Sequence, residues 1–83
     1  MAKTSADTTY RAIGRRIKAL RKKHALTQEG LARLIGVRAM EVSRWERGTR
    51  RPSVNSLVQL EKKLDVSMSW LTRGDSAQAD HGQ

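Results

Sequence analysis

The sequence of 83 residues contains no cysteine, no phenylalanine and a single proline. Without cysteine the chain has neither a disulfide framework nor a thiolate zinc site, and an intracellular setting fits. No apolar run approaches the roughly 18–20 residues that a membrane span needs, and the N-terminus lacks the apolar core of a secretory signal. We therefore expect a cytoplasmic protein that has no membrane partner.

Acidic residues are also scarce, and they are unevenly placed. The chain has 17 Lys and Arg residues against 8 Asp and Glu, which gives a net charge of +9. Residues 11–51 hold 13 of the basic residues and 3 of the acids, whereas residues 52–83 are close to neutral. A basic half of this kind is typical of nucleic-acid binding, and the alternative is a solvated basic surface.

The groupings that would support catalysis or metal binding are missing from the sequence. The chain has 2 histidines, one of them His81 near its end, and it has no glycine-rich phosphate loop, no Ser-His-acid set and no set of metal ligands. We therefore expect no catalytic residue, no metal and no cofactor. A binding protein is favoured over an enzyme.

The apolar residues recur at spacings of three and four, and no stretch alternates as a strand would. We expect one domain over residues 9–74, between a flexible segment 1–8 and a polar tail 75–83. The first helix is expected to follow a cap at Asp7, Thr8 or Thr9 and to run to about residue 23. The others are expected at 28–35 after the cap Thr27, at about 38–47, after the cap Ser53, and after the cap Ser67. Gly36 supplies the positive φ of a sharp turn after the second helix.

The inward side of each helix follows from the same spacing. The first helix is expected to bury Tyr10, Ile13, Ile17 and Leu20. The next three are expected to bury, in order, Leu31, Ala32 and Ile35; Val42 and Trp45; and Leu57, Leu60 and Leu64. We therefore expect five short helices around a single core of Leu, Ile, Val and Trp side chains.

Five linked segments carry a specific resemblance. They are Thr27-Gln28-Glu29 with Leu31-Ala32, Ile35-Gly36-Val37, Val42-Ser43-Arg44-Trp45-Glu46 with Gly48, Arg51-Pro52-Ser53, and Leu57, Leu60, Leu64-Asp65-Val66-Ser67 and Trp70-Leu71. Together they resemble the Cro and phage-repressor family of helix-turn-helix proteins, also called the XRE family, over about residues 11–74. The resemblance implies a compact all-α, lambda-repressor-like DNA-binding domain of five helices, with the helix-turn-helix at helices two and three.

In such folds the N-terminal part of the third helix enters the major groove of duplex DNA. By match of position, the resemblance implies base contacts from Arg38, Ala39, Met40 and Arg44. Arg44 is long enough to pair with guanine O6 and N7, and Ala39 or Met40 suits a thymine methyl group. The alternatives are a phosphate contact or a solvated side chain for Arg44, and a core position for Met40.

Phosphate contacts are expected on both sides of this helix. The resemblance places Gln28, at the start of the second helix, against a phosphate, where the helix N-terminus also favours an anion. Further candidates are Ser43, Arg47, Thr49, Arg50 and Arg51. The alternative for the arginine-rich loop is that it serves solubility alone.

Two further sets have expected structural roles. The family commonly pairs an arginine of the first helix with the glutamate that closes the third, and the matching residues are Arg21 and Glu46. Met68, Trp70 and Leu71 form the candidate dimer interface, with closure of the monomer core as the alternative.

The sequence departs from the family pattern at several positions. Gly30 stands where a capping glutamate is frequent, His24-Ala25 where the turn frequently has glycine, and Arg38 where Ser or Thr usually caps the third helix. Glu41 adds a negative charge to the third helix, for which water or an ion pair is favoured over a cytosine contact. These departures leave the base sequence of the DNA site open.

The resemblance implies a sequence-specific transcriptional regulator of double-stranded DNA. A repressor that acts as a homodimer on a palindromic operator is the favoured form, with half-sites about one helical turn apart. One alternative is an antitoxin that also binds a toxin protein, and another is an adaptor that contacts the transcription machinery. In each case the protein is expected in the cytoplasm, and as a DNA-binding protein on the nucleoid.

Overall fold

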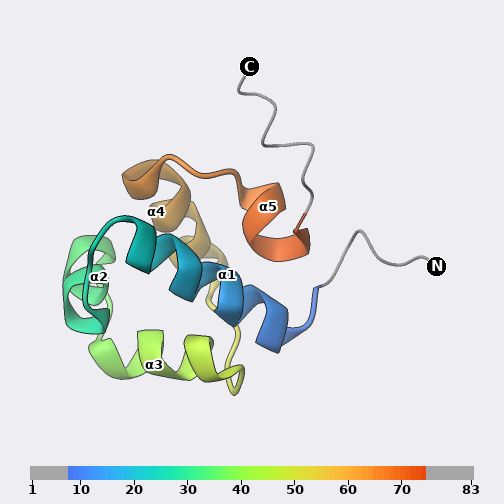
Figure 1. The fold of residues 1–83 in the computed structure, drawn as a ribbon, viewed down its shortest axis with the longest axis horizontal. Coiled ribbons are helices and arrows are strands. Elements are labelled where there is room, and N and C mark those ends of the chain that lie inside the picture. The colour runs from blue at the N-terminus through green and yellow to red at the C-terminus, as the bar shows by residue number, and fades with distance from the viewer. Residues whose placement is uncertain (1–7, 75–83) are drawn as a thin grey trace.

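The computed structural model describes residues 8–74, which form helices and no strand (Figure 1). In chain order the helices are α1 (Tyr10–Lys23), α2 (Gln28–Ile35), α3 (Ala39–Arg47), α4 (Val54–Leu64) and α5 (Met68–Arg73). The predicted all-α fold of five helices is therefore confirmed for this part of the chain. The segments predicted to be flexible lie outside the described residues, apart from Thr8. No helix in residues 8–74 is long and apolar enough to cross a membrane.

Hydroxyl side chains begin all the helices except α3. Thr9, Thr27, Ser53 and Ser67 each accept a hydrogen bond from the backbone N–H three residues further on, as N-cap residues do. Arg38 occupies the N-cap position of α3 and makes no such side-chain bond. The third helix therefore starts at Ala39, one residue later than expected, and its first turn lacks a side-chain cap.

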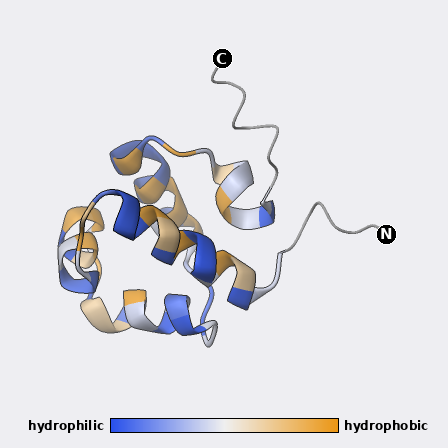
Figure 2. Cartoon of the chain, viewed as in Figure 1, coloured by the Kyte–Doolittle hydropathy of each residue, from blue (hydrophilic) through white to orange (hydrophobic). Residues whose placement is uncertain are grey.

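One apolar core joins all five helices. Figure 2 shows that apolar and polar positions follow one another along each helix. The core residues are Ile13, Ile17, Leu20, Leu31, Ala32, Ile35, Val42, Trp45, Leu57, Leu60, Leu64 and Leu71. Tyr10 was expected in the stripe of α1, but it is 50% exposed. That prediction was wrong because Tyr10 is the first residue of α1, where the stripe runs past the end of the core.

The turn between α2 and α3 is built on Gly36. This residue has φ +78°, in the left-handed region that glycine enters without strain. The N–H of Val37 then donates to the carbonyl oxygen of Ala32 at 2.9 Å, and the Val37 side chain packs against the core. The turn therefore fixes the angle at which α3 leaves α2.

Helices α1 and α3 meet at Gly14, which is buried. A Cβ atom at this position would overlap the carbonyl oxygen of Trp45 and would lie 2.9 Å from its carbonyl carbon. The neighbouring atoms belong to the backbone, so a rotamer change does not relieve the overlap. The absence of a side chain at Gly14 therefore allows the end of α3 to lie against α1.

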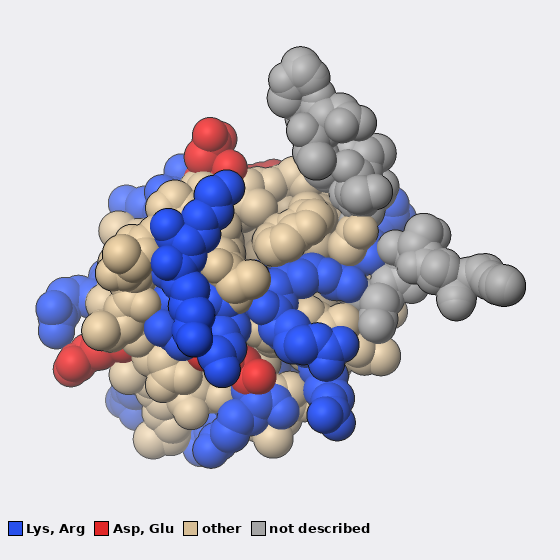
Figure 3. All heavy atoms as spheres, in the orientation of Figure 1, with Lys and Arg blue, Asp and Glu red and all other residues tan. Residues whose placement is uncertain are grey.

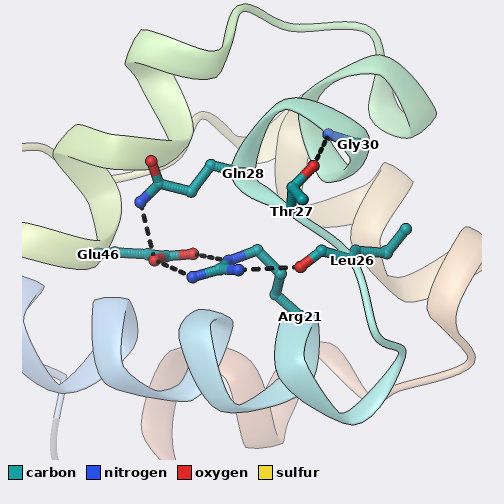
Figure 4. A network of polar contacts seen from close by, with 6 residues as sticks. All are labelled: Arg21, Leu26, Thr27, Gln28, Gly30 and Glu46. Atoms are coloured by element: carbon teal, nitrogen blue, oxygen red, sulfur yellow. Dashed lines mark hydrogen bonds and ion pairs between the residues drawn. The ribbon is translucent and has the colours of Figure 1, made fainter.

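An ion pair holds the same two helices together beside this contact (Figure 4). Arg21 donates from Nε to Glu46 Oε2 at 2.6 Å and from a terminal nitrogen to Oε1 at 2.9 Å, and it also donates to the carbonyl of Leu26 at 2.9 Å. The two side chains are only 12% and 4% exposed. Burial alone would raise the pKa of Glu46, but the hydrogen bonds from Arg21 and Gln28 and the positive charge of Arg21 hold that pKa below its ordinary value.

Replacing Gly14 by alanine is expected to lower the free energy of unfolding by about 3 kcal/mol, because α1 and α3 must separate to admit the methyl group. The matched control is Gly30→Ala in α2. A Cβ there would lie 3.2 Å from Thr27 Oγ1 and 3.5 Å from a Leu26 methyl, and alanine gains helix propensity, so little loss is expected. Urea denaturation of both variants measures the difference. Equal stability of the two would contradict the close contact at Gly14.

The ion pair predicts a dependence of stability on pH. Because the pKa of Glu46 is lowered on folding, its contribution is complete above its ordinary pKa of 4.5 and is lost as the pH falls through the folded value. Replacing Arg21 alone by methionine is expected to cost about 3–5 kcal/mol at pH 7, through an uncompensated buried charge. The double variant Arg21→Met with Glu46→Leu is expected to recover much of that loss.

Denaturation at a series of pH values checks this prediction. The free energy of unfolding of the unmodified protein should fall more steeply below about pH 4.5 than that of the double variant. If the free energy of unfolding falls equally with decreasing pH in the two proteins, the ion pair does not stabilise the fold.

Candidate nucleic-acid interface

The outward side of α3 carries Met40, Arg44 and Arg47, which share one face because they are spaced by four and three residues. Met40 is 52% exposed, Arg44 is half-buried and Arg47 is exposed. The opposite side of the helix carries Val42 and Trp45, which are buried in the core. The core therefore fixes which side of α3 is exposed to solvent.

The four residues expected to contact bases differ in exposure. Arg38 and Met40 are exposed, and Arg44 is partly so. Ala39 is half-buried and packs against the core, so less of its side chain is open to a ligand. The structure brings Arg38, Met40 and Arg44 to the accessible surface of the first turns of α3.

Glu41 lies away from this face. It lines a hollow between the α2–α3 turn and the loop that follows α3. Arg38, Arg50 and Arg51 line the same hollow, with the side of Trp45 behind them. Three basic side chains and the single acid of the first turn of α3 therefore line one hollow, and no ion pair of 4 Å or less forms between them within residues 8–74.

The residues expected to contact phosphate lie at both ends of the helix-turn-helix. Arg47, Arg50 and Arg51 are exposed in or beside the loop after α3. Thr49 caps the end of α3, since its hydroxyl donates to the carbonyl of Arg44 at 3.2 Å, and its backbone N–H donates to the same oxygen at 3.0 Å. Ser43 is half-buried on α3.

Gln28 begins α2 and is half-buried. Its amide nitrogen donates to Glu46 Oε1 at 3.0 Å, so the residue expected at a phosphate is joined to the ion pair of the core (Figure 4). The sequence carries no signal for this contact, because the two residues lie eighteen positions apart on different helices. The contact appears only when α2 and α3 are placed in space.

The basic residues of α1 divide into two groups. The helix contains no acid, and its seven cations are Arg11, Arg15, Arg16, Lys18, Arg21, Lys22 and Lys23. Arg21 and Arg16 have internal roles, since Arg16 donates to the carbonyl of Leu71 at 3.2 Å and joins α1 to α5. Figure 3 shows Lys and Arg side chains over much of the visible face, with few acids among them. The sequence reasoning missed the structural role of Arg16, because its spacing matches that of the surface cations.

The residues expected at a dimer interface are not equally available. Leu71 has no exposed surface and belongs to the monomer core, so it cannot contribute side-chain area to an interface. Met68 and Trp70 are half-buried. Trp70 also lines a shallow groove with Ala19, Leu20 and Val66, which has Lys23 and Asp65 at its edge. Only Met68 and Trp70 of the three therefore offer surface to a second chain.

No group of three or more His, Asp or Glu side chains suited to a metal ion occurs in the described residues. The polar groups that the helix-turn-helix exposes are guanidinium groups, the amide of Gln28 and hydroxyls, which are groups that commonly contact nucleic acid. This set can bind phosphate oxygens and the acceptor atoms of base edges.

Comparison with known proteins gives matches over the same region. The family model described as helix-turn-helix matches residues 17–71. The chain is 37% identical over 68 residues to repressor protein C2 of Salmonella phage P22, covering 82% of this chain and 32% of that protein. It is 38% identical over 69 residues to the transcriptional regulator DicA of Escherichia coli K12, covering 83% of this chain and 51% of DicA.

A solved structure supports the same relationship. The crystal structure of the P22 c2 repressor in complex with a synthetic operator matches with a TM-score of 0.72 and 38% identity, over 76% of this chain and 96% of that one. The chain spans about a third of the length of repressor protein C2 and about half of the length of DicA. The segment matched by the family model contains α2, α3 and α4 in full and the second half of α1. The chain belongs to the Cro and phage-repressor (XRE) family of helix-turn-helix proteins.

Proposed function

We propose that this protein represses transcription by binding a specific sequence in double-stranded DNA, as a homodimer on a palindromic operator in the cytoplasm. The observation that carries the proposal is the face of α3, on which Met40 and Arg44 are accessible while Val42 and Trp45 anchor the helix in the core. The relationship to a repressor whose structure contains operator DNA supports it. No separate effector domain is needed, because a bound dimer blocks promoter DNA by occupying it.

In this proposal α3 lies in the major groove and its first turns face the base edges. Arg44 pairs with a guanine through O6 and N7, Met40 packs against a thymine methyl group, and Arg38 adds a cation at the N-terminal end of the helix. Ala39 contacts DNA only through the part of its side chain that the core leaves open. Specificity then depends mainly on Met40 and Arg44.

Phosphate contacts hold the helix in this position. Gln28 binds the backbone on one side, and Ser43, Arg47, Thr49, Arg50 and Arg51 bind it on the other. Each cation that neutralises a phosphate releases counterions, so the affinity falls as salt rises, with a slope of about −0.9 per contact in log–log form. Arg47, Arg50 and Arg51 therefore supply affinity with little sequence information.

Selection of bound sequences from random duplex DNA tests the specificity. The unmodified protein is expected to enrich a palindrome, and Arg44→Ala is expected to lose preference at one base pair of each half-site, at about 1–3 kcal/mol per site. The control Arg51→Ala is expected to weaken all sequences alike and to reduce the salt slope by about 1. Binding without any enriched sequence would favour the adaptor alternative and contradict the repressor proposal. A palindrome unchanged by Arg44→Ala would remove Arg44 from the base contacts.

The dimer is proposed to form through Met68 and Trp70 of α5. Met68→Lys should then abolish the cooperative gain of a full palindrome over a single half-site, because it places a charge in an apolar contact. Val54→Lys is the matched control, since Val54 is 70% exposed on α4 and the charge change is the same. Sedimentation of the DNA complexes measures the stoichiometry. Cooperative binding by Met68→Lys equal to that of the control would place the dimer contact elsewhere.

A stable complex with a co-purified toxin protein would favour the antitoxin alternative.

A further inference from the structure

Gln28 is held by a partner that is itself fixed. Its amide nitrogen lies 3.0 Å from Glu46 Oε1, and the Glu46 side chain is 4% exposed. Arg21 donates two hydrogen bonds to the same carboxylate, at 2.6 and 2.9 Å. Figure 4 shows the amide nitrogen of Gln28 turned toward Glu46 and its oxygen turned away. A glutamine at a helix end is normally mobile, but this one rests on an anchored group.

The chemistry of the carboxylate decides which way the amide faces. An ionised carboxylate accepts hydrogen bonds and cannot donate one, so only the nitrogen end of Gln28 suits it. The amide has two N–H groups, of which one is used by Glu46. A neutral amide at position 46 would accept or donate, and both orientations of Gln28 would then be populated. The negative charge at Glu46 therefore selects one orientation.

The surroundings of Gln28 suit an anion. Thr27 caps α2 by accepting from Gly30 N–H at 2.9 Å, and the Leu31 N–H is bonded to the Thr27 carbonyl at 2.9 Å. The preceding N–H groups, of Gln28 and Glu29, have no partner within the helix, as is general for a first turn. A phosphate oxygen accepts hydrogen bonds, so it requires N–H groups at this end of α2 and disfavours the amide oxygen.

We propose that Glu46 is a positioning residue for DNA binding. Its buried carboxylate, braced by Arg21, holds the Gln28 amide with one N–H directed inward and leaves the second N–H for a phosphate oxygen of the DNA backbone. This inference rests on the proposed phosphate contact of Gln28. It gives the ion pair of the core a second role, in which the contact between α1 and α3 also prepares the N-terminus of α2 for its ligand.

The direction of the change in DNA affinity distinguishes a positioning role of Glu46 from simple charge repulsion. Glu46 is negative, so removing its charge should by itself strengthen attraction to DNA. Positioning predicts the opposite result. Glu46→Gln should weaken binding about fivefold per domain, because the amide of Gln28 no longer has a single orientation.

A double-mutant cycle on the affinity for duplex DNA tests the proposal. The probes are the enriched duplex and a scrambled one, and the variants are Gln28→Ala, Glu46→Gln and the two combined. The effect of Glu46→Gln should disappear when Gln28 is already alanine. Equal effects in both backgrounds would show that Glu46 acts only on the fold, and tighter binding by Glu46→Gln would show that its charge acts only by repulsion. If Gln28→Ala alone leaves the affinity unchanged, it is the proposed phosphate contact that fails.

A second variant guards against loss of folding. Arg21→Met with Glu46→Leu replaces the ion pair by apolar side chains, which commonly preserves the fold, and it removes the acceptor of Gln28. It should bind DNA as weakly as Glu46→Gln, at a temperature where circular dichroism shows all variants folded. Affinity equal to that of the unmodified protein would overturn the positioning role.

Nuclear magnetic resonance gives a readout that a purely structural role would leave unchanged. In the free protein, one Nε2 proton of Gln28 should resonate downfield of the other because it is bonded to the carboxylate. Addition of duplex DNA should shift the second proton downfield and leave the first in place. Movement of both protons together, or loss of the first bond on binding, would contradict the proposal.

Discussion

The contact between α1 and the end of α3 holds the helix-turn-helix in place. At this crossing Gly14 admits the backbone of Trp45, and Arg21 and Glu46 form a nearly buried ion pair beside it. Loss of either partner would leave a charge in an apolar setting, so the pair strongly favours one arrangement of the two helices. Because α3 also packs on α2 through the turn at Gly36, fixing it against α1 fixes the whole helix-turn-helix.

This arrangement fixes which side of α3 is exposed at the surface. A single core uses the inward sides of all five helices, and Val42 and Trp45 set the rotation of α3 about its axis. The outward side is then left to Met40, Arg44 and Arg47. The same network reaches Gln28 through Glu46, so the support of α3 and the surface at the start of α2 share one set of hydrogen bonds. Glu46 therefore belongs both to the ion pair that holds α3 against α1 and to the proposed DNA-binding surface at Gln28.

Most of the fold could be predicted from the sequence, since periodicity and capping are local signals. Thr27, Ser53 and Ser67 begin helices as predicted. The apolar spacing predicted the core residues of α1 to α4, but it also included the exposed Tyr10, and Leu71 of α5 was favoured as an interface residue although it lies in the core. Contacts between helices could not be predicted in the same way. Nothing in a run of basic residues marks Arg16 as the partner of the Leu71 carbonyl.

The candidate site was likewise predictable from the sequence only in part. The resemblance named Arg38, Met40 and Arg44, and the structure places them at the surface, whereas the partial burial of Ala39 and the full burial of Leu71 depend on packing. The position of Glu41 among Arg38, Arg50 and Arg51 likewise required the turn and the loop to be placed together. The sequence thus predicted that α3 carries the candidate site, whereas the packing of the core determines which of its side chains are exposed.

We propose that this protein binds duplex DNA through the outward face of α3, with the start of α2 against the DNA backbone. The most direct measurement is a backbone amide titration by nuclear magnetic resonance with a duplex that carries the enriched palindrome. We expect saturable shifts at Arg38 to Arg44, at Gln28 and in the loop that follows α3, with little change along α4 after its first turn. Shifts spread over the cations of α1, without saturation and without change at Met40 or Arg44, would contradict the proposal.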